Sequence, residues 1–277
     1  QLIHPEGAPR YREYWTAYHQ IMERRGVTPA VAKATLRTNP TVIGALMVVR
    51  GDADAVICGT VGQFRRHMKD VHDIIGLKPG VETAAAMNAL IIPKGTYFFC
   101  DTQVNPDPSI AQISEMTLMA VEEIDRFGIK PRVALLSHSN FGTHDTDSAY
   151  KMRSVLADLR HRAPHLEIDG EMQADLALSD DLRKTVMPNS TLRGEANLFV
   201  MPNVDAANIA FNMMRILGEG ISIGPILLGV AQPAHILTPS VTPRGIVNVT
   251  ALATVEAQVY AETTRKSKPF HQRILGI

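Results

Sequence analysis

The stretch that most constrains the fold runs from residue 133 to residue 148 and reads VALLSHSNFGTHDTDS. Its first four residues are all apolar, which predicts a short strand buried on both faces, since a half-exposed strand would alternate. Small polar residues follow, and a helix is expected from about 147 to about 161. A strand that passes through small polar residues into a helix N-terminus is typical of α/β proteins, which hold anions at such turns.

The turn between this strand and its helix is rich in hydrogen-bond donors. Its hydroxyl, amide and glycine residues suit a phosphate or a carbonyl oxygen, and the same spacing also fits an ordinary strand-to-helix turn. The candidate ligand residues are Ser137, Ser139, Asn140, Gly142, Thr143 and Ser148.

The rest of the chain repeats this alternation of strands and helices. The strands predicted near 83–92, 96–101, 166–168, 196–201 and 225–230 are mostly apolar and do not alternate, which indicates parallel sheets covered on both faces. We therefore expect two α/β layers with a cleft between them. Polar residues follow three strand ends, at 137–143, 169–175 and 202–208, where such folds bind ligands. Two prolines within 105–108 predict a domain hinge.

Composition excludes several classes of protein. Among 277 residues, 28 basic side chains balance 28 acidic ones, so nothing favours binding to nucleic acid. No apolar run is long enough to cross a membrane, and no signal peptide is visible. The two cysteines, Cys58 and Cys100, are far apart and suggest neither a disulfide framework nor a zinc site, so both are expected as reduced thiols in a cytoplasmic protein.

Two charged groups have a functional and an ordinary interpretation. Asp169, Glu171 and Asp175 suit acid–base chemistry or magnesium, or equally an acidic cluster at a helix N-terminus that starts near 170. A basic set on the helix near 63–75 suits an anionic ligand, or equally a solvated helix face. It consists of Arg65, Arg66 and Lys69. No glycine-rich nucleotide loop and no serine-hydrolase motif occurs.

Six segments, in order, resemble the phosphate acetyltransferase/butyryltransferase family. They are NPTVIGALMVVRGDADAVICG (39–59), CDTQVNPDPS (100–109), RVALLSHSN (132–140), LEIDGEMQADLAL (166–178), ANLFVMPNVDAANIAF (196–211) and GPILLGVAQPAHIL (224–237). The resemblance implies two α/β domains of the isocitrate-dehydrogenase-like type, with coenzyme A and an acyl phosphate bound between them. It also implies that one domain, 106–230, is inserted into another, 1–105 plus 231–277, whose opening βα segment would precede residue 1.

The same resemblance assigns ligand-binding positions. They are Arg65, Lys69, Ser137, Ser139, Asn140, Phe141, Gly142, Thr143, Asn203, Asp205, Thr238 and Ser240. Lys69 stands where the family has an arginine, and a lysine lacks the bidentate guanidinium.

Two departures decide the expected activity. The family's catalytic arginine, which is thought to hold the acyl phosphate, falls at Pro239, and its aspartate, thought to deprotonate coenzyme A, falls at Gly245. Neither replacement offers a charge or a proton acceptor. The resemblance therefore implies no catalytic residue and no metal in this segment.

Within the family, the SHSNFG loop followed by SAYKMR is most similar to the C-terminal domains of bacterial NADP-dependent malic enzymes. This implies a regulatory domain that binds acetyl-CoA or a related CoA ester and forms homo-oligomers. NADP and Mg²⁺ or Mn²⁺ would bind the malic-enzyme domain of the same polypeptide, outside this segment. Two alternatives stay open: an active phosphate acetyltransferase that uses Arg244 and Ser240, and an oligomerisation scaffold without a ligand.

Overall fold

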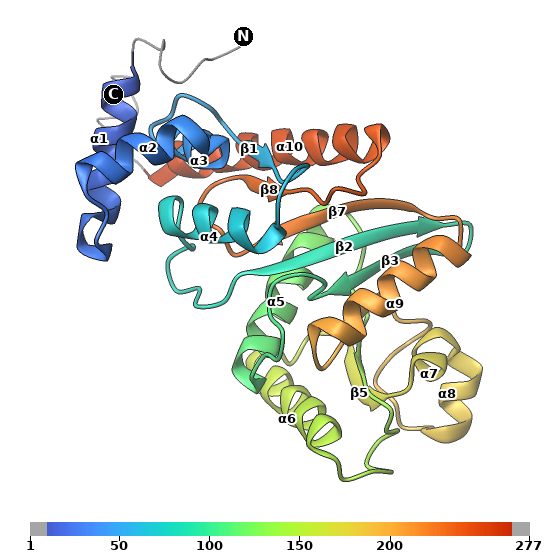
Figure 1. Cartoon of the computed structure of the whole chain (residues 1–277). Coiled ribbons are helices and arrows are strands. Elements are labelled where there is room, and N and C mark those ends of the chain that lie inside the picture. Colours follow the sequence, from blue (N-terminus) through green and yellow to red (C-terminus); the bar gives the residue numbers. More distant parts are fainter. Residues whose placement is uncertain (1–9, 268–277) are drawn as a thin grey trace. The chain divides into compact units, whose positions relative to one another are not determined.

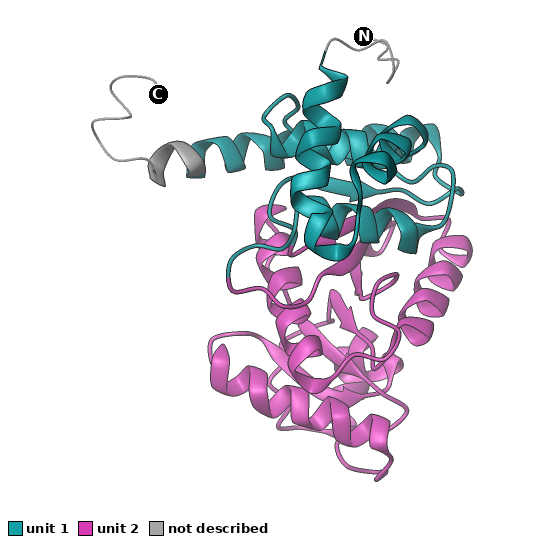
Figure 2. Ribbon diagram, turned by 60° about the vertical axis from the view of Figure 1, so that its left-hand side comes forward, with its two compact units in different colours: residues 1–79, 230–277 teal, residues 80–229 magenta. Residues whose placement is uncertain are grey.

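The computed structural model describes residues 10–267 and forms two compact units (Figure 2). Unit 1 comprises the described residues of 1–79 and 230–277, and unit 2 comprises residues 80–229. Unit 2 thus lies, in sequence, between the two parts of unit 1. No helix among residues 10–267 is both long and apolar enough to cross a membrane.

The start of the inserted domain differs from the prediction, which placed it at 106. The strands β2 (Ala85–Ile92) and β3 (Gly95–Cys100) belong to unit 2, because β3 pairs with β6 (Leu198–Val200) and β2 pairs with β7 (Ile221–Leu228). The predicted hinge at 105–108 consequently lies inside unit 2. Prolines mark an irregular segment, but they do not reveal which strands pair across it.

Unit 1 is mostly helical. Its elements are α1 (Tyr11–Met22), the 3₁₀-helix η2 (Glu23–Arg25), α2 (Pro29–Thr38), α3 (Pro40–Val49), β1 (Val56–Cys58), α4 (Phe64–Ile74), β8 (Ala234–Ile236) and α10 (Pro243–Ser267). Local chemistry fixes two of the helix starts. Thr28 and Asn39 accept N–H groups of the first turns of α2 and α3, and each precedes a proline at the first helical position. Strands β1 and β8 pair in parallel.

Unit 2 is built on a six-stranded sheet with the order β5-β4-β6-β3-β2-β7 (Figure 1). The remaining strands are β4 (Val133–Leu136) and β5 (Ile168–Met172), and the helices are α5 (Ile110–Arg126), α6 (Asp147–Arg162), α7 (Ala174–Leu178), α8 (Asp180–Val186) and α9 (Val204–Leu217). The pairs β3–β6, β6–β4 and β4–β5 are parallel, whereas β2 pairs antiparallel with both neighbours. The sheets are mainly parallel, as predicted. Helix α5 begins with a capping box formed by Ser109 and Gln112.

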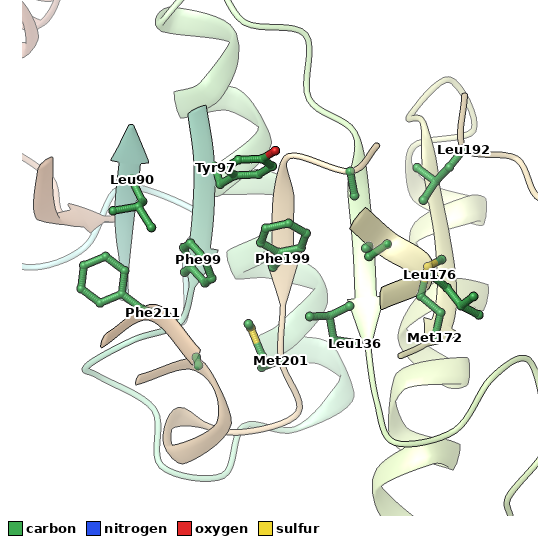
Figure 3. Close-up of a cluster of buried hydrophobic side chains, with 14 residues drawn as sticks. Leu90, Tyr97, Phe99, Leu136, Met172, Leu176, Leu192, Phe199, Met201 and Phe211 are labelled. Atoms are coloured by element: carbon green, nitrogen blue, oxygen red, sulfur yellow. The ribbon is translucent and has the colours of Figure 1, made fainter. Parts of the chain in front are cut away.

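Helices cover both faces of this sheet. Helices α5 and α6 contact one face, and α7 and α9 contact the other. Figure 3 shows a buried cluster on the second face, where the ring of Phe99 lies 5.3 Å from that of Phe199 and 5.7 Å from that of Phe211. These rings hold the strand ends in a fixed frame, because a packed interior deforms little.

Both cysteines are free thiols, Cys100 buried and Cys58 half-buried. Burial raises the pKa of the Cys58 thiol to about 11 and that of the Cys100 thiol well above its ordinary value. Neither is therefore an activated nucleophile.

Candidate functional site

The turn after β4, residues 137–144, is called the donor loop below. The sequence predicts N–H groups that are open to an anion, and the structure shows a different arrangement. Each backbone N–H of residues 139–144 donates to an acceptor within unit 2. The acceptors are Ser137 Oγ for Ser139, Thr143 Oγ1 for Asn140, the Glu171 carbonyl for Phe141, Glu171 Oε1 for Gly142, the Asn140 carbonyl for Thr143 and Ser139 Oγ for His144.

Glu171 stands at the centre of this network. Its side chain is fully buried, and Oε1 accepts hydrogen bonds from Ser139 Oγ at 2.7 Å and Gly142 N at 2.9 Å. The guanidinium of Arg153, on α6, lies 3.5 Å from the same oxygen. Its other oxygen, Oε2, is buried without a hydrogen-bond partner among the described residues. The loop is therefore held around an internal carboxylate, and its N–H groups are not open to a ligand.

The location of Glu171 corrects the expectation of a helix starting near 170. Residues 168–172 form β5, and α7 begins at Ala174. The pairing of β5 with β4 shifts register next to Glu171, and such bulges redirect a side chain. Gly170 is required at this point, because its φ is +145° and a Cβ would lie 2.6 Å from the carbonyl oxygen of Leu135.

The three predicted carboxylates do not form one site. Asp169 accepts from Ser190, Thr191 and Arg160, and Asp175 is exposed in the first turn of α7. Among residues 10–267, no group of three His, Cys, Asp or Glu side chains is arranged to hold a metal ion. The acid–base and magnesium interpretations of this cluster thus have no geometric support.

Asp101, which the sequence analysis did not single out, organises the end of β3. Its carboxylate accepts from the backbone N–H groups of residues 86, 103, 104 and 105, and from the Asn105 side chain at 2.6 Å. Burial raises the pKa of Asp101, although these hydrogen-bond donors favour its ionised form and lower the pKa in turn.

The predicted residues Asn203 and Asp205 follow β6. Asn203 caps α9, since its side chain accepts from Ala206 N at 2.9 Å, and Asp205 lies in the first turn of that helix.

Few ligand donors remain free in the donor loop. Asn140 accepts from Gln173 N at 2.8 Å through Oδ1, which leaves its Nδ2 without a partner among the described residues. Phe141 has a left-handed backbone (φ +48°) and packs against the buried cluster. The loop therefore offers one oriented amide and the hydroxyl groups at its rim.

Unit 1 supplies the predicted cations. Arg65 and Arg66 are exposed on α4 and have no ion-pair partner within residues 10–267. Lys69 differs, because it pairs with Asp73, which also binds Arg25, and this carboxylate raises the pKa of Lys69. Of these three cations of α4, Arg65 and Arg66 are therefore the two that could pair with an anionic ligand.

The turn between β8 and α10 carries the remaining predicted residues. Thr238 and Ser240 bond to each other at 3.1 Å between their hydroxyl oxygens, and Pro239 is exposed. Gly245 is buried in the first turns of α10, where its N–H donates to Thr242 Oγ1.

The family model for the phosphate acetyl/butaryl transferases matches residues 1–254. The chain belongs to this family. A phosphate acetyltransferase from Nitratidesulfovibrio vulgaris is 30% identical over 93% of the chain and 36% of its own length. Two solved phosphotransacetylases share the fold. The structure from Streptococcus pyogenes has a TM-score of 0.81 and is 27% identical, and the match covers 91% of this chain and 77% of that one. EutD of Staphylococcus aureus has a TM-score of 0.77 and is 26% identical, and the match covers 93% of this chain and 78% of that one.

Other curated relatives are more similar in sequence. The NADP-dependent malic enzyme of Escherichia coli and the NAD-dependent malic enzyme of Rhizobium meliloti are each 54% identical over 93% of the chain. The chain spans only 34% and 33% of their lengths. It therefore corresponds to the phosphotransacetylase-like part of these malic enzymes.

Membership in the transferase family gives the β8–α10 turn its significance. At the positions implied for the family's arginine and aspartate, the structure has the exposed Pro239 and the buried Gly245. The only charged residue from 237 to 246 is Arg244, which is exposed and has no ion-pair partner among the described residues. Residues 137–143, Asn203 and Asp205 lie in unit 2, and Arg65, Lys69, Thr238 and Ser240 lie in unit 1.

Proposed function

We propose that this chain is the phosphotransacetylase-like domain of a malic enzyme, and that it binds acetyl-CoA or a related CoA ester as a regulatory effector without transferring the acetyl group. The parent polypeptide would oxidatively decarboxylate malate to pyruvate with NADP and Mg²⁺ or Mn²⁺, all bound by its malic-enzyme domain, in the cytoplasm. The 54% identity to malic enzymes supports this assignment of the parent.

The observation that carries the non-catalytic assignment is the pair Pro239 and Gly245. Removing one transition-state donor typically costs about 3–4 kcal/mol of barrier, roughly 10²–10³ in rate. General-base catalysis typically increases the rate by roughly another 10²–10⁴-fold. A chain that lacks both has no appreciable transfer. Arg244 does not replace the arginine directly, since it lies five residues further along the chain, at the start of α10.

The chain does, in contrast, keep the kinds of side chain that binding of a CoA ester requires. The phosphates of a CoA ester need cations, and Arg65 and Arg66 are exposed guanidinium groups without ion-pair partners among the described residues. The ester's carbonyl needs an oriented donor, and Nδ2 of Asn140 is one. We assign recognition of the phosphates to Arg65 and Arg66 of unit 1, and Asn140 is a separate candidate donor in unit 2.

Homo-oligomerisation is supported by an apolar face on α9. Its side chains Ile209, Met213, Ile216 and Leu217 are 58–78% exposed, at the spacing of one helix face. Exposed apolar groups of this kind mark association surfaces. Light scattering at micromolar concentration is expected to give a dimer or larger, and the double substitution Met213→Glu/Leu217→Glu is expected to give a smaller species. A monomeric wild-type chain would contradict this part of the proposal.

The test of regulation uses the full-length enzyme. Asn140→Ala and Arg65→Glu, made separately, are expected to weaken inhibition by acetyl-CoA about tenfold or more and to leave malate turnover without the effector unchanged. Lys69→Glu should act more weakly, because Lys69 is already paired with Asp73. Arg162→Gln, which removes a similar surface charge from α6, is the control. Inhibition that survives both main substitutions would place the effector site elsewhere.

A further inference from the structure

Unit 2 contains a basic cavity of about 340 Å³ that the proposed function does not use. Its lining comes from three segments: the start of β3, the residues just before β4 and the residues just before β6. These segments lie at the amino ends of parallel strands, whereas the donor loop follows the carboxyl end of β4. The cavity is therefore distinct from the donor loop.

Arg132 is the central side chain of the cavity. It is half-buried, and its Nε donates to the carbonyl oxygen of Glu195 at 2.5 Å. No carboxylate among residues 10–267 pairs with its guanidinium. Five other arginines of unit 2 do pair with carboxylates: Arg126, Arg153, Arg160, Arg162 and Arg183. Glu167, which is ion-paired with Lys130, also lies within electrostatic range of Arg132. The half-buried guanidinium still has no direct carboxylate partner, and a bound anion would offset its desolvation cost.

The position of Arg132 is fixed before any ligand arrives. Asn197, only 5% exposed, accepts from Arg132 N at 2.7 Å and donates through Nδ2 to the Lys130 carbonyl at 2.9 Å. The bond from Nε to the Glu195 carbonyl fixes the guanidinium and leaves its two terminal nitrogens free. A pair of terminal N–H groups in one plane matches the two oxygens of a carboxylate or phosphate.

The local charge also favours an anion. Lys94 and Lys130 line the cavity with Arg132, and each lysine has one carboxylate partner, Glu195 at 2.9 Å and Glu167 at 2.8 Å. Three cations against two carboxylates leave one positive charge in excess, although the chain as a whole is neutral. An incoming anion would interact with the unpaired Arg132 and with lysines whose other N–H groups can still donate.

We propose that this cavity is a binding site for a small dianion that presents a carboxylate or phosphate group to Arg132. Its volume lies near the lower end of the range of small-molecule sites, about 300–1,000 Å³, which excludes a whole CoA ester. The site is independent of the assignment of the donor loop. Because Arg132 immediately precedes β4 and the donor loop immediately follows it, one strand of four residues joins the two places.

The test titrates the full chain with inorganic phosphate and, separately, with succinate, and follows backbone amide NMR shifts. Saturable shifts are expected at residues 95–97, 130–132 and 195–197 for at least one probe, and the stronger probe identifies the phosphate or the carboxylate class. Arg132→Gln is expected to weaken this binding about tenfold or more, and Arg132→Lys, which keeps the charge but not the planar pair, by a smaller factor. Arg162→Gln should leave it unchanged.

Two outcomes overturn the proposal: no saturable shift at these residues up to about 20 mM of either probe, well above the millimolar end of ordinary affinities, or equal binding by wild type and Arg132→Gln. If Arg132→Gln fails to fold, Lys130→Gln takes its place. Lys130 is largely exposed, so its removal should weaken binding without affecting folding. Unchanged affinity in that variant would then count against the site.

Discussion

The turn before α6 in unit 2 and the turn before α10 in unit 1 each lead from a strand into a long helix, but they are built in opposite ways. The turn between β4 and α6 surrounds a buried carboxylate that engages Ser139, Gly142 and Arg153. The turn between β8 and α10 has no charged residue before Arg244, and within residues 10–267 its Thr238 and Ser240 side chains hydrogen-bond only to each other. The first turn is therefore held by an internal carboxylate, whereas the second has Pro239 and Gly245 at the positions that the resemblance implies for the family's arginine and aspartate.

The comparison predicts a large loss of stability when the internal carboxylate is removed. Glu171→Ala leaves the Ser139 hydroxyl and the Gly142 N–H buried without an acceptor, at about 1–3 kcal/mol for each group. We expect the free energy of unfolding, measured with urea, to fall by roughly 3–4 kcal/mol. Asp145→Ala is the control, because Asp145 is 91% exposed and its pair with Arg153 should contribute less than about 1 kcal/mol. A Glu171→Ala loss no larger than that of the control would contradict the account of this loop.

A matched pair of serines gives a smaller effect that distinguishes the same two turns. Ser139 is fully buried, donates to Glu171 and accepts from His144 N at 3.1 Å, so Ser139→Ala should cost about 1–3 kcal/mol. Ser240 is exposed, and its side chain has Thr238 as its one hydrogen-bond partner in the described part of the chain, so Ser240→Ala should change stability by less than about 0.5 kcal/mol. Thermal unfolding of the two variants side by side measures the difference. Equal losses would mean that the two turns are equally constrained.

The helix caps are where the two turns should behave alike. Thr146 accepts from Ala149 N at 3.3 Å, and Thr242 accepts from Gly245 N at 3.1 Å. Replacing either threonine by alanine should cost about 1 kcal/mol, as for other capping residues. Chemical denaturation of both variants is the measurement. A much larger loss at Thr146 would show that the cap contributes to the rigidity that we assign to Glu171.

Local signals in the sequence account for several of the helix starts. Thr28-Pro29, Asn39-Pro40 and the box formed by Ser109 and Gln112 each carry the residues that their own first turn needs. The apolar run at 133–136 likewise became a strand with all four residues buried. These elements depend on neighbours within a few residues, which a sequence displays directly.

Features that depend on distant pairing were not predicted. The sequence placed residues 169–171 after a strand, but the pairing of β5 with β4 extends that strand to Met172 and buries Glu171 under the donor loop. The domain boundary moved for the same reason, since β2 and β3 pair with β7 and β6, whose residues lie a hundred or more positions further along the chain. The Arg132 cavity also joins three separate segments. No local pattern identifies such partners.

The sequence displays which polar groups the candidate residues carry, but not whether those groups already have partners within the fold. The donor loop has the donors that the sequence predicts, and all six N–H groups of residues 139–144 are already in use. Lys69 is likewise a cation that already has a partner, whereas Arg65 has none among the described residues. Whether a polar group is free depends on the fold around it, which composition does not encode.

The central claim is that this member of the transferase family binds a CoA ester without transferring its acetyl group. The most direct measurement is the rate of acetyl phosphate formation by the chain from acetyl-CoA and inorganic phosphate, with both at saturating concentration. We predict no turnover above the rate without protein, because Pro239 and Gly245 supply neither the charge nor the base. Turnover within about a hundredfold of a typical enzyme, which is ~10 s⁻¹, would contradict the claim and favour an active acetyltransferase that uses Arg244 and Ser240.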